Sequence, residues 1–130
     1  MVIDTSALLA ILKAEPEAEA LIEALSRPGP RWISTATLLE TRLVVERNLG
    51  EPGQAELQRL LATAAVTPLP LEEAHVHWAL EGWRHYGKGR HRAALNLGDC
   101  FSYGLARALG APLLFKGDDF AATDLPSALS

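Results

Sequence analysis

This chain of 130 residues has one cysteine, few aromatic side chains and no long apolar run. The single cysteine, Cys100, excludes a disulfide within the chain. The longest apolar run, residues 7–12, is too short to cross a bilayer, and no basic segment precedes Asp4 as a secretion signal would require. We therefore expect a soluble cytoplasmic protein without a membrane-spanning segment.

Aromatic residues make up 6% of the chain, whereas leucine and alanine are abundant among its hydrophobic 48%. Leucine and alanine favour helices, and an all-β sandwich would need more valine, isoleucine, threonine and tyrosine. The length suits one domain with one packed core. We expect a single domain over residues 1–130 with more helix than strand.

Positive charge is scarce as well, because the net charge is -4. Generic adhesion to nucleic acid depends on lysine and arginine that neutralise phosphates, so this charge argues against it. Four of the 12 basic residues nevertheless fall within one basic segment: Arg84, Lys88, Arg90 and Arg92. The basic charge is therefore concentrated at one place in the chain.

Short apolar runs alternate with segments of helical periodicity along the whole chain. The expected strands cover residues 2–3, 32–33, 66–67 and 113–115, and the expected helices cover 7–12, 16–26, 35–48, 54–65, 71–84 and 98–109. Glu51, Pro52 and Gly53 are expected to break the third helix, and Gly110 to end the last one. This order indicates an α/β fold in which helices cover both sides of a mainly parallel sheet of about four to five strands.

Acidic residues follow the expected strands. Asp4 comes directly after the first strand, Asp99 opens the last long helix, and Asp118 and Asp119 follow the last strand. Ligand sites of open parallel sheets lie at the carboxyl ends of the strands, so we expect these side chains to converge. Two carboxylates about 4 Å apart repel by roughly 4 kcal/mol at an effective dielectric near 20, so a group of them favours a bound cation.

Each of these aspartates also has an ordinary structural use. Asp4 suits a helix N-cap, Asp99 is stabilised in a first helical turn by the helix dipole, and Asp118 and Asp119 suit a turn. Glu40 is harder to explain in this way, because its helical neighbours Leu43 and Val44 are expected to be buried.

For Glu40 the alternative to a shared site is an ion pair with Arg42 or Arg47. A common metal site accounts for all the acids at once. Oxygen ligands favour Mg²⁺ or Mn²⁺, and such ions suit phosphodiester hydrolysis. Thr5 and Ser6 are candidates to hydrogen-bond to the metal ligands or to a metal-bound water, besides their use as helix caps.

Four segments together carry a resemblance to a known family. They are the opening run from Val2 to Leu8 with its Asp-Thr-Ser, Glu40 in the helix after the second strand, the Leu-Asn-Leu-Gly-Asp-Cys run ending at Cys100, and the Lys-Gly-Asp-Asp-Phe run ending at Phe120. In their order and spacing they resemble the PIN-domain ribonucleases, and among these the VapC toxins of bacterial toxin–antitoxin pairs. The resemblance extends from residue 1 to about residue 125.

The resemblance implies a three-layer α/β/α sandwich and an Mg²⁺-dependent endoribonuclease, with Mn²⁺ as the alternative ion. It gives Asp4, Glu40 and Asp99 the role of catalytic metal ligands. The fourth acid is Asp119, with Asp118 as the alternative, because relatives often have asparagine where this chain has Asp118. The implied partners are an RNA substrate, a VapB-like antitoxin over the active-site groove and a second copy of the chain in a homodimer.

An acidic pocket repels RNA, so the basic segment of Arg84, Lys88, Arg90 and Arg92 is predicted to hold the RNA backbone, with a merely solvated loop as the alternative. Two other functions remain open at this point. One is a catalytically silent module that binds RNA or an antitoxin on the same fold. The other is a phosphatase with Asp4 as nucleophile, which is disfavoured because Ser6 lies where such enzymes have a second aspartate.

Overall fold

The computed structural model describes residues 1–130 and contains one four-stranded sheet. All pairings are parallel, and the spatial order is β3-β2-β1-β4. The strands are β1 (Val2–Ile3), β2 (Trp32–Ser34), β3 (Thr67–Leu69) and β4 (Leu113–Leu114). The predicted parallel sheet is thereby confirmed, at four strands.

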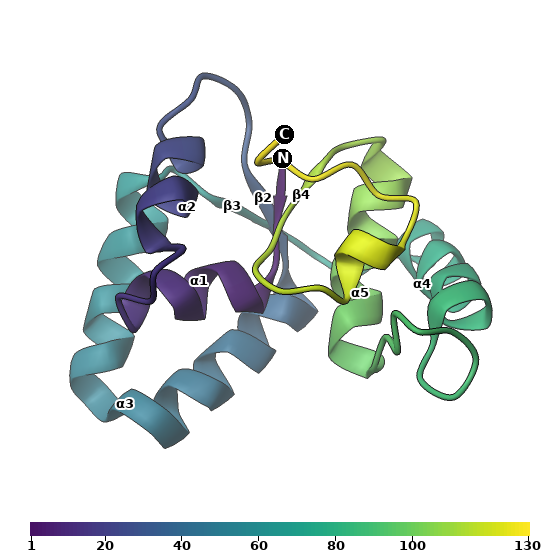
Figure 1. The fold of residues 1–130 in the computed structure, drawn as a ribbon. Helices are drawn as coiled ribbons and strands as arrows, with labels where there is room; N and C mark the ends of the chain where they lie inside the picture. Colours follow the sequence, from purple (N-terminus) through teal and green to yellow (C-terminus); the bar gives the residue numbers. More distant parts are fainter.

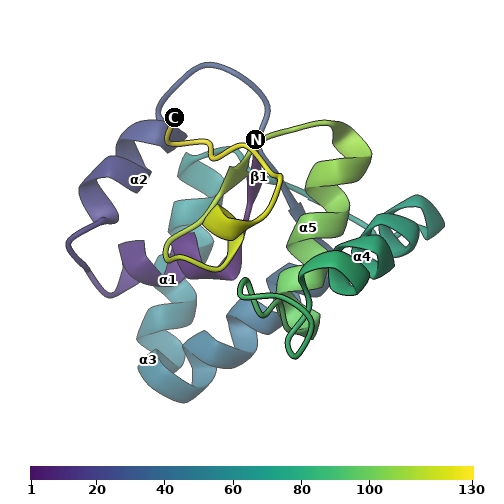
Figure 2. The same ribbon diagram turned by 45° about the vertical axis from the view of Figure 1, so that its right-hand side comes forward.

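Five helices cover the two faces of this sheet. They are α1 (Thr5–Leu12), α2 (Ala18–Leu25), α3 (Thr35–Thr63), α4 (Glu73–Tyr86) and α5 (Leu97–Leu109), with a 3-10 turn η1 at Phe120–Ala122. Helices α1, α2 and α3 lie on one side of the sheet, α5 lies on the other, and α4 packs along the outside of α5 (Figures 1 and 2). The predicted α/β/α sandwich is confirmed. No helix combines the length and the apolar character that a bilayer span needs.

The two faces of the central strands bury two separate cores. Val2 and Leu113 belong to the cluster beneath α5, while Ile3 and Leu114 belong to the cluster beneath α1, α2 and α3. All four side chains are fully buried. Successive side chains of a strand point to opposite faces, so two adjacent apolar residues per strand supply both cores.

Helix α3 is divided as expected, but at another residue. Residues 35–48 and 54–65 were expected as two helices with a break at residues 51–53, and α3 consists of two helices joined at a kink, which lies at Gly50 with φ 62° and ψ -156°. Glycine reaches this backbone region at little cost. Pro52 then occupies the first turn of the second half, where its missing N–H removes no helical hydrogen bond.

Two cap residues bound the last long helix. Asn96 accepts a hydrogen bond from the backbone N–H of Asp99 at 2.9 Å, and the Asp99 carboxylate accepts one from the Asn96 N–H at 3.0 Å. This capping box starts α5 at Leu97, one residue before the expected start. At the other end Gly110 adopts the left-handed conformation, with φ 62° and ψ 34°, and ends the helix as predicted.

Candidate active site

The acidic residues identified in the sequence lie near the points where strands end and the following helices begin. Asp4 follows β1 and caps α1, where its Oδ2 accepts a hydrogen bond from the Ser6 N–H at 3.0 Å. Glu40 lies in the second turn of α3, directly after β2, and Asp99 lies in the first turn of α5. Asp119 lies in the loop after β4 and precedes η1. The parallel strands therefore bring these residues to one edge of the sheet.

Electrostatic coupling shows that these side chains face a common region. Burial first, and then the charges of Asp4, Asp119 and Glu40, raise the pKa of Asp99 to about 6, against a hydrogen bond from the Asn96 backbone that lowers it. The pKa of Glu40 is also raised, first by burial and then by the charge of Asp4, against the hydrogen bond from Thr5. The structure thus brings Asp4, Glu40, Asp99 and Asp119 into one acidic cluster.

A close approach at Gly98 locates the Glu40 carboxylate. A Cβ added to Gly98 would lie 1.8 Å from Glu40 Oε2 and 2.6 Å from Glu40 Cδ. Any side chain at this position would therefore overlap the carboxylate. The Glu40 side chain accordingly lies against the first turn of α5, beside Asp99.

The two neighbouring aspartates after β4 differ in their relation to this cluster. Asp119 contributes to the raised pKa of Asp99, and Asp118 does not. Both residues are exposed. The charge effect on Asp99 is consistent with Asp119 as the fourth acid.

The expected surroundings of Glu40 were partly wrong. Leu43 is 57% exposed, so Glu40 does not interrupt a buried stripe, because the buried positions of α3 are one residue further on, at Thr37, Thr41 and Val45. The alternative of an ion pair is excluded as well. None of the ion pairs in the structure includes Glu40.

Arg42, one of the two proposed partners of Glu40, hydrogen-bonds instead to Gln54 at 3.3 Å and to Gln58 at 3.1 Å. The same set of ion pairs leaves the three aspartates of the cluster without a basic partner too. The negative charge of the cluster is thus uncompensated by lysine or arginine.

The donor set of the cluster fits a hard divalent cation, because it offers only carboxylate oxygens and an uncompensated negative charge. As the side chains stand, no three histidine, cysteine, aspartate or glutamate residues lie close enough together to hold one ion. Binding of an ion would have to draw the carboxylates together.

The raised pKa of Asp99 predicts a pH-dependent stability. The folded state binds the Asp99 carboxyl proton more tightly than the unfolded chain does. The free energy of unfolding should therefore fall as the pH rises from about 4 to about 6. We expect a fall of about 1 kcal/mol for this partly solvated group, after allowance for solvent screening. Asp99→Asn should lose most of the fall, which urea denaturation with a chelator across this pH range would measure. If the free energy of unfolding of Asp99→Asn fell by the same amount, the pH dependence would not come from Asp99.

Hydroxyl groups contact the acids from the side of the core. Thr5 Oγ1 donates to Glu40 Oε1 at 2.6 Å. The Ser6 hydroxyl contacts no acid and instead accepts a hydrogen bond from the Lys116 N–H at 3.0 Å, which ties the loop after β4 to α1. Sequence reasoning missed Ser102, whose hydroxyl donates to Asp4 Oδ1. Its position three residues after Asp99, on the same face of α5, was the available signal.

The basic segment lies where it was expected, at the end of α4 and in the following loop. Arg84 forms an ion pair with Glu81 at 2.9 Å, and the Arg90 guanidinium lies 4.2 Å from the centre of the Trp83 ring. Lys88 and Arg92 are exposed and form no ion pair. These two residues are therefore the cations of the segment that remain free for a phosphate.

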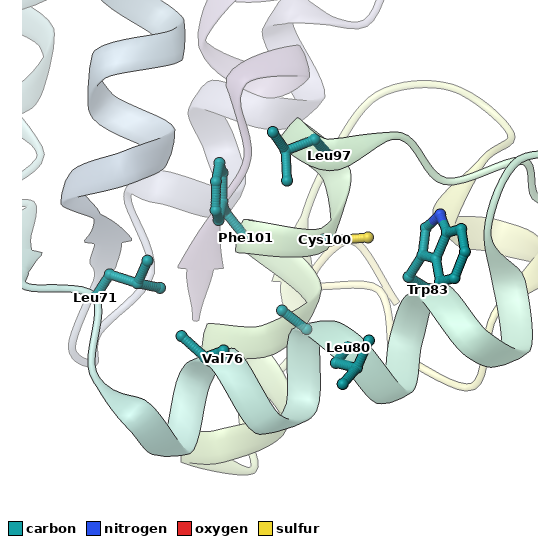
Figure 3. A pocket seen from close by; sticks show the side chains of 8 residues that line it. Leu71, Val76, Leu80, Trp83, Leu97, Cys100 and Phe101 are labelled. Atoms are coloured by element: carbon teal, nitrogen blue, oxygen red, sulfur yellow. The ribbon is translucent and has the colours of Figure 1, made fainter.

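An apolar groove of about 350 Å³ runs between α4 and α5 (Figure 3). Its lining residues include Leu97, Cys100 and Phe101 from α5, together with Val76, Leu80 and Trp83 from α4. Burial, followed by the charge of Asp99, raises the pKa of Cys100 to about 11, so its thiol packs as a small apolar group. Leu97 is 71% exposed.

Comparison with known proteins identifies the fold and the family. The PIN domain model matches residues 1–125. The chain is 54% identical over 125 residues to ribonuclease VapC30 of Mycobacterium tuberculosis H37Rv, which covers 96% of this chain and 95% of that protein. It is 52% identical over 125 residues to ribonuclease VapC of Mycolicibacterium smegmatis, with coverage of 96% and 97%.

Solved structures share the fold at low sequence identity. Mycobacterium tuberculosis VapC20, described as a sarcin-ricin loop cleaving toxin, matches with a TM-score of 0.75 and 19% identity, over 95% of each chain. A toxin–antitoxin complex from Klebsiella pneumoniae matches with a TM-score of 0.68 and 18% identity, over 95% of this chain and 92% of that one. The chain belongs to the PIN-domain family. Its identity to curated relatives places it among the VapC ribonucleases of that family.

Proposed function

We propose that this chain is the toxin of a type II toxin–antitoxin pair and that it hydrolyses RNA as an Mg²⁺-dependent endoribonuclease. The observation that carries the proposal is the acidic cluster without basic partners, in a chain that is 54% identical to a named VapC ribonuclease. Mn²⁺ is the alternative ion, because it shares the preference of Mg²⁺ for oxygen ligands.

In this proposal Asp4, Glu40, Asp99 and Asp119 are the metal-binding and catalytic acids. A divalent ion bound there would lower the pKa of a water molecule and neutralise the scissile phosphate. Thr5 holds the Glu40 carboxylate, and the Ser6 N–H holds that of Asp4, so both acids keep their orientation. By analogy with the family we expect products with a 5′-phosphate and a 3′-hydroxyl.

The basic segment gives the acidic site a means of holding RNA. Lys88 and Arg92 are exposed and unpaired, and the loop that carries them leads through Asn96 into the helix turn of Asp99. Cations next to an acidic pocket offset its repulsion of the phosphate backbone. We propose that these two residues, with Arg84 and Arg90, bind the RNA strand beside the scissile phosphate.

A cleavage assay with defined ions tests the proposed activity. Purified protein is expected to cut single-stranded RNA with Mg²⁺ or Mn²⁺ and to stop when EDTA is added, because the acids repel the phosphate without a cation. Sequencing of the RNA 5′ ends would identify the products. Cleavage that continues in EDTA would contradict the metal requirement, whereas RNA binding without cleavage would favour the silent binding module.

The apolar groove between α4 and α5 is our proposed surface for the VapB-like antitoxin. Cys100 lines the groove and the charge of Asp99 acts on it, so the groove and the acidic cluster share the first turns of α5. A peptide whose apolar side chains fill the groove and whose lysine or arginine reaches the acids would complement both the groove and the acidic cluster. A second copy of the chain would instead bring a further net charge of -4. We also expect a homodimer, which sedimentation of the purified toxin would measure, but we assign this groove to the antitoxin.

Substitution in the groove should weaken antitoxin binding. Val76→Asp combined with Leu80→Asp is expected to weaken the affinity for the antitoxin by about 30-fold or more, because two exposed apolar contacts become charged. Isothermal titration with the purified antitoxin would measure the change. Ile22→Asp is the matched control, since Ile22 is an exposed apolar residue on α2. Equal losses in both proteins, or none in either, would contradict the assignment of the groove.

A further inference from the structure

Four buried hydroxyl groups, linked in the middle through the backbone of Thr37, form a chain of contacts between two of the acids. Thr5 is 7% exposed, and Thr37, Thr41 and Ser102 are fully buried. Thr5 Oγ1 lies 2.9 Å from Thr41 Oγ1, and Thr41 Oγ1 lies 2.9 Å from the Thr37 carbonyl oxygen. Thr37 Oγ1 lies 3.3 Å from Ser102 Oγ. The chain joins α1, α3 and α5 beneath the acidic cluster.

The two ends of this hydroxyl chain rest on carboxylates. Ser102 donates to Asp4 Oδ1, and Thr5 donates to Glu40 Oε1 at 2.6 Å. An ionised carboxylate accepts hydrogen bonds and donates none, and each hydroxyl has one proton. Both protons at the ends of the chain must therefore point outward to the acids.

These directions settle the Asp4 end of the chain. Because Ser102 gives its proton to Asp4, its contact with Thr37 requires Thr37 to be the donor. The Thr41 hydroxyl donates to the Thr37 carbonyl oxygen, so its one proton is not available for Thr5, which donates to Glu40. Only Asp4 thus has a buried hydroxyl donor that a second hydroxyl orients.

Asp4 is the better-defined end of the chain. Its Oδ1 accepts from Ser102 on α5, and its Oδ2 accepts from the Ser6 N–H on α1. Donors from two different helices hold the two oxygens, so the carboxylate cannot rotate without losing a buried hydrogen bond. Ligating carboxylates are commonly held by hydrogen bonds in this way.

We propose that Ser102 and Thr37 are positioning residues, which fix the Asp4 carboxylate in the orientation that binds a divalent ion. This inference rests on the proposed function, in which Asp4 is a metal ligand. Ser102 acts directly on Asp4, and Thr37 acts through Ser102. Apolar residues of the same size would fill the core equally well, so the hydroxyls are there for the hydrogen bonds.

Mn²⁺ affinity, measured by electron paramagnetic resonance or calorimetry without RNA, tests the proposal. Ser102→Ala is expected to weaken Mn²⁺ binding by about 10-fold or more. It should lower kcat for RNA cleavage and leave KM for RNA unchanged, because the basic segment is untouched. Thr37→Val should have a smaller effect in the same direction, and Thr37→Ser, which keeps the hydroxyl, should restore affinity.

A double variant and a control separate positioning from general damage. Ser102→Ala combined with Thr37→Val should bind Mn²⁺ no more weakly than Ser102→Ala alone, since Thr37 acts only through Ser102. Tyr103→Phe is the matched control, because Tyr103 lies next on α5 and its hydroxyl donates to Asp124 at 2.8 Å, away from the acids. It should keep the Mn²⁺ affinity of the unmodified chain.

Two outcomes would overturn the inference in distinguishable ways. If the unmodified chain cleaves RNA and binds Mn²⁺, and folded Ser102→Ala binds Mn²⁺ equally well, the positioning role is wrong and the proposed function stands. If the unmodified chain neither binds Mn²⁺ nor cleaves RNA, the proposed function fails and the inference fails with it. Circular dichroism would establish that each variant is folded.

Discussion

Asp4→Asn protein is expected to lose about 10³-fold in the rate of RNA cleavage while it keeps its fold. Asparagine is as good an N-cap as aspartate and can accept the hydrogen bond from the Ser6 N–H that starts α1. It has nearly the same volume, so the buried position after β1 stays filled. The variant loses the negative charge and one carboxylate oxygen, which are the features that would bind a cation.

The measurement is a comparison of single-turnover cleavage rates with Mg²⁺ at matched protein concentration. Glu19→Gln, which removes an exposed acid from α2, controls for the change in net charge. Asp119→Asn should slow cleavage more than Asp118→Asn does, because the charge of Asp119 raises the pKa of Asp99 and that of Asp118 does not. Undiminished cleavage by folded Asp4→Asn protein would defeat the assignment of the acidic cluster as the active site.

Gly98→Ala is expected to lower RNA cleavage by about 100-fold without loss of stability, because misplacement of a catalytic group by about 1 Å can cost this much. The added Cβ would lie 1.8 Å from Glu40 Oε2, so the carboxylate has to move out of the cluster. The Glu40 side chain is flexible and the position is helical, so the backbone need not shift. Alanine also has the higher helix propensity, by up to about 1 kcal/mol.

Gly104→Ala shows the opposite behaviour and is the natural comparison. There an added Cβ would lie 2.4 Å from the backbone oxygen of His75, where no flexible side chain can give way. We expect Gly104→Ala to destabilise the fold by about 1 to 3 kcal/mol, because α4 has to move away from α5. Thermal unfolding and cleavage assays on both variants distinguish the effects. If Gly98→Ala were fully active, Glu40 would not need its present position.

Local chemistry made several elements predictable before any coordinates. Asp4 follows two apolar residues and caps the helix after them, and Gly110 ends α5 in the left-handed conformation that glycine favours. The alternation of strands and helices predicted a parallel sheet covered on both faces, and the order of the acidic motifs predicted the family. These features depend on neighbouring residues or on a repeated pattern, so one sequence is enough to reveal them.

Other features depend on contacts between distant segments. Leu43 was expected to be buried beside Glu40, and it is 57% exposed, because α3 turns the face of Thr37 and Thr41 to the core instead. Helical periodicity alone does not say which of two adjacent stripes faces the sheet. The choice between Asp118 and Asp119 likewise depends on where the loop after β4 lies relative to α5, which the sequence does not give.

The amino-acid sequence was enough to determine that this protein has one sheet in an α/β fold and that acidic residues follow its strands. It could do so because strand, cap and turn preferences act over a few residues. Only the tertiary structure decided how those acids are held. Asp4 meets Ser102 across 98 positions of sequence, and Glu40 meets Thr5 across 35. Such hydrogen bonds arise when helices from both faces of the sheet meet at the carboxyl ends of its strands, and no local preference encodes them.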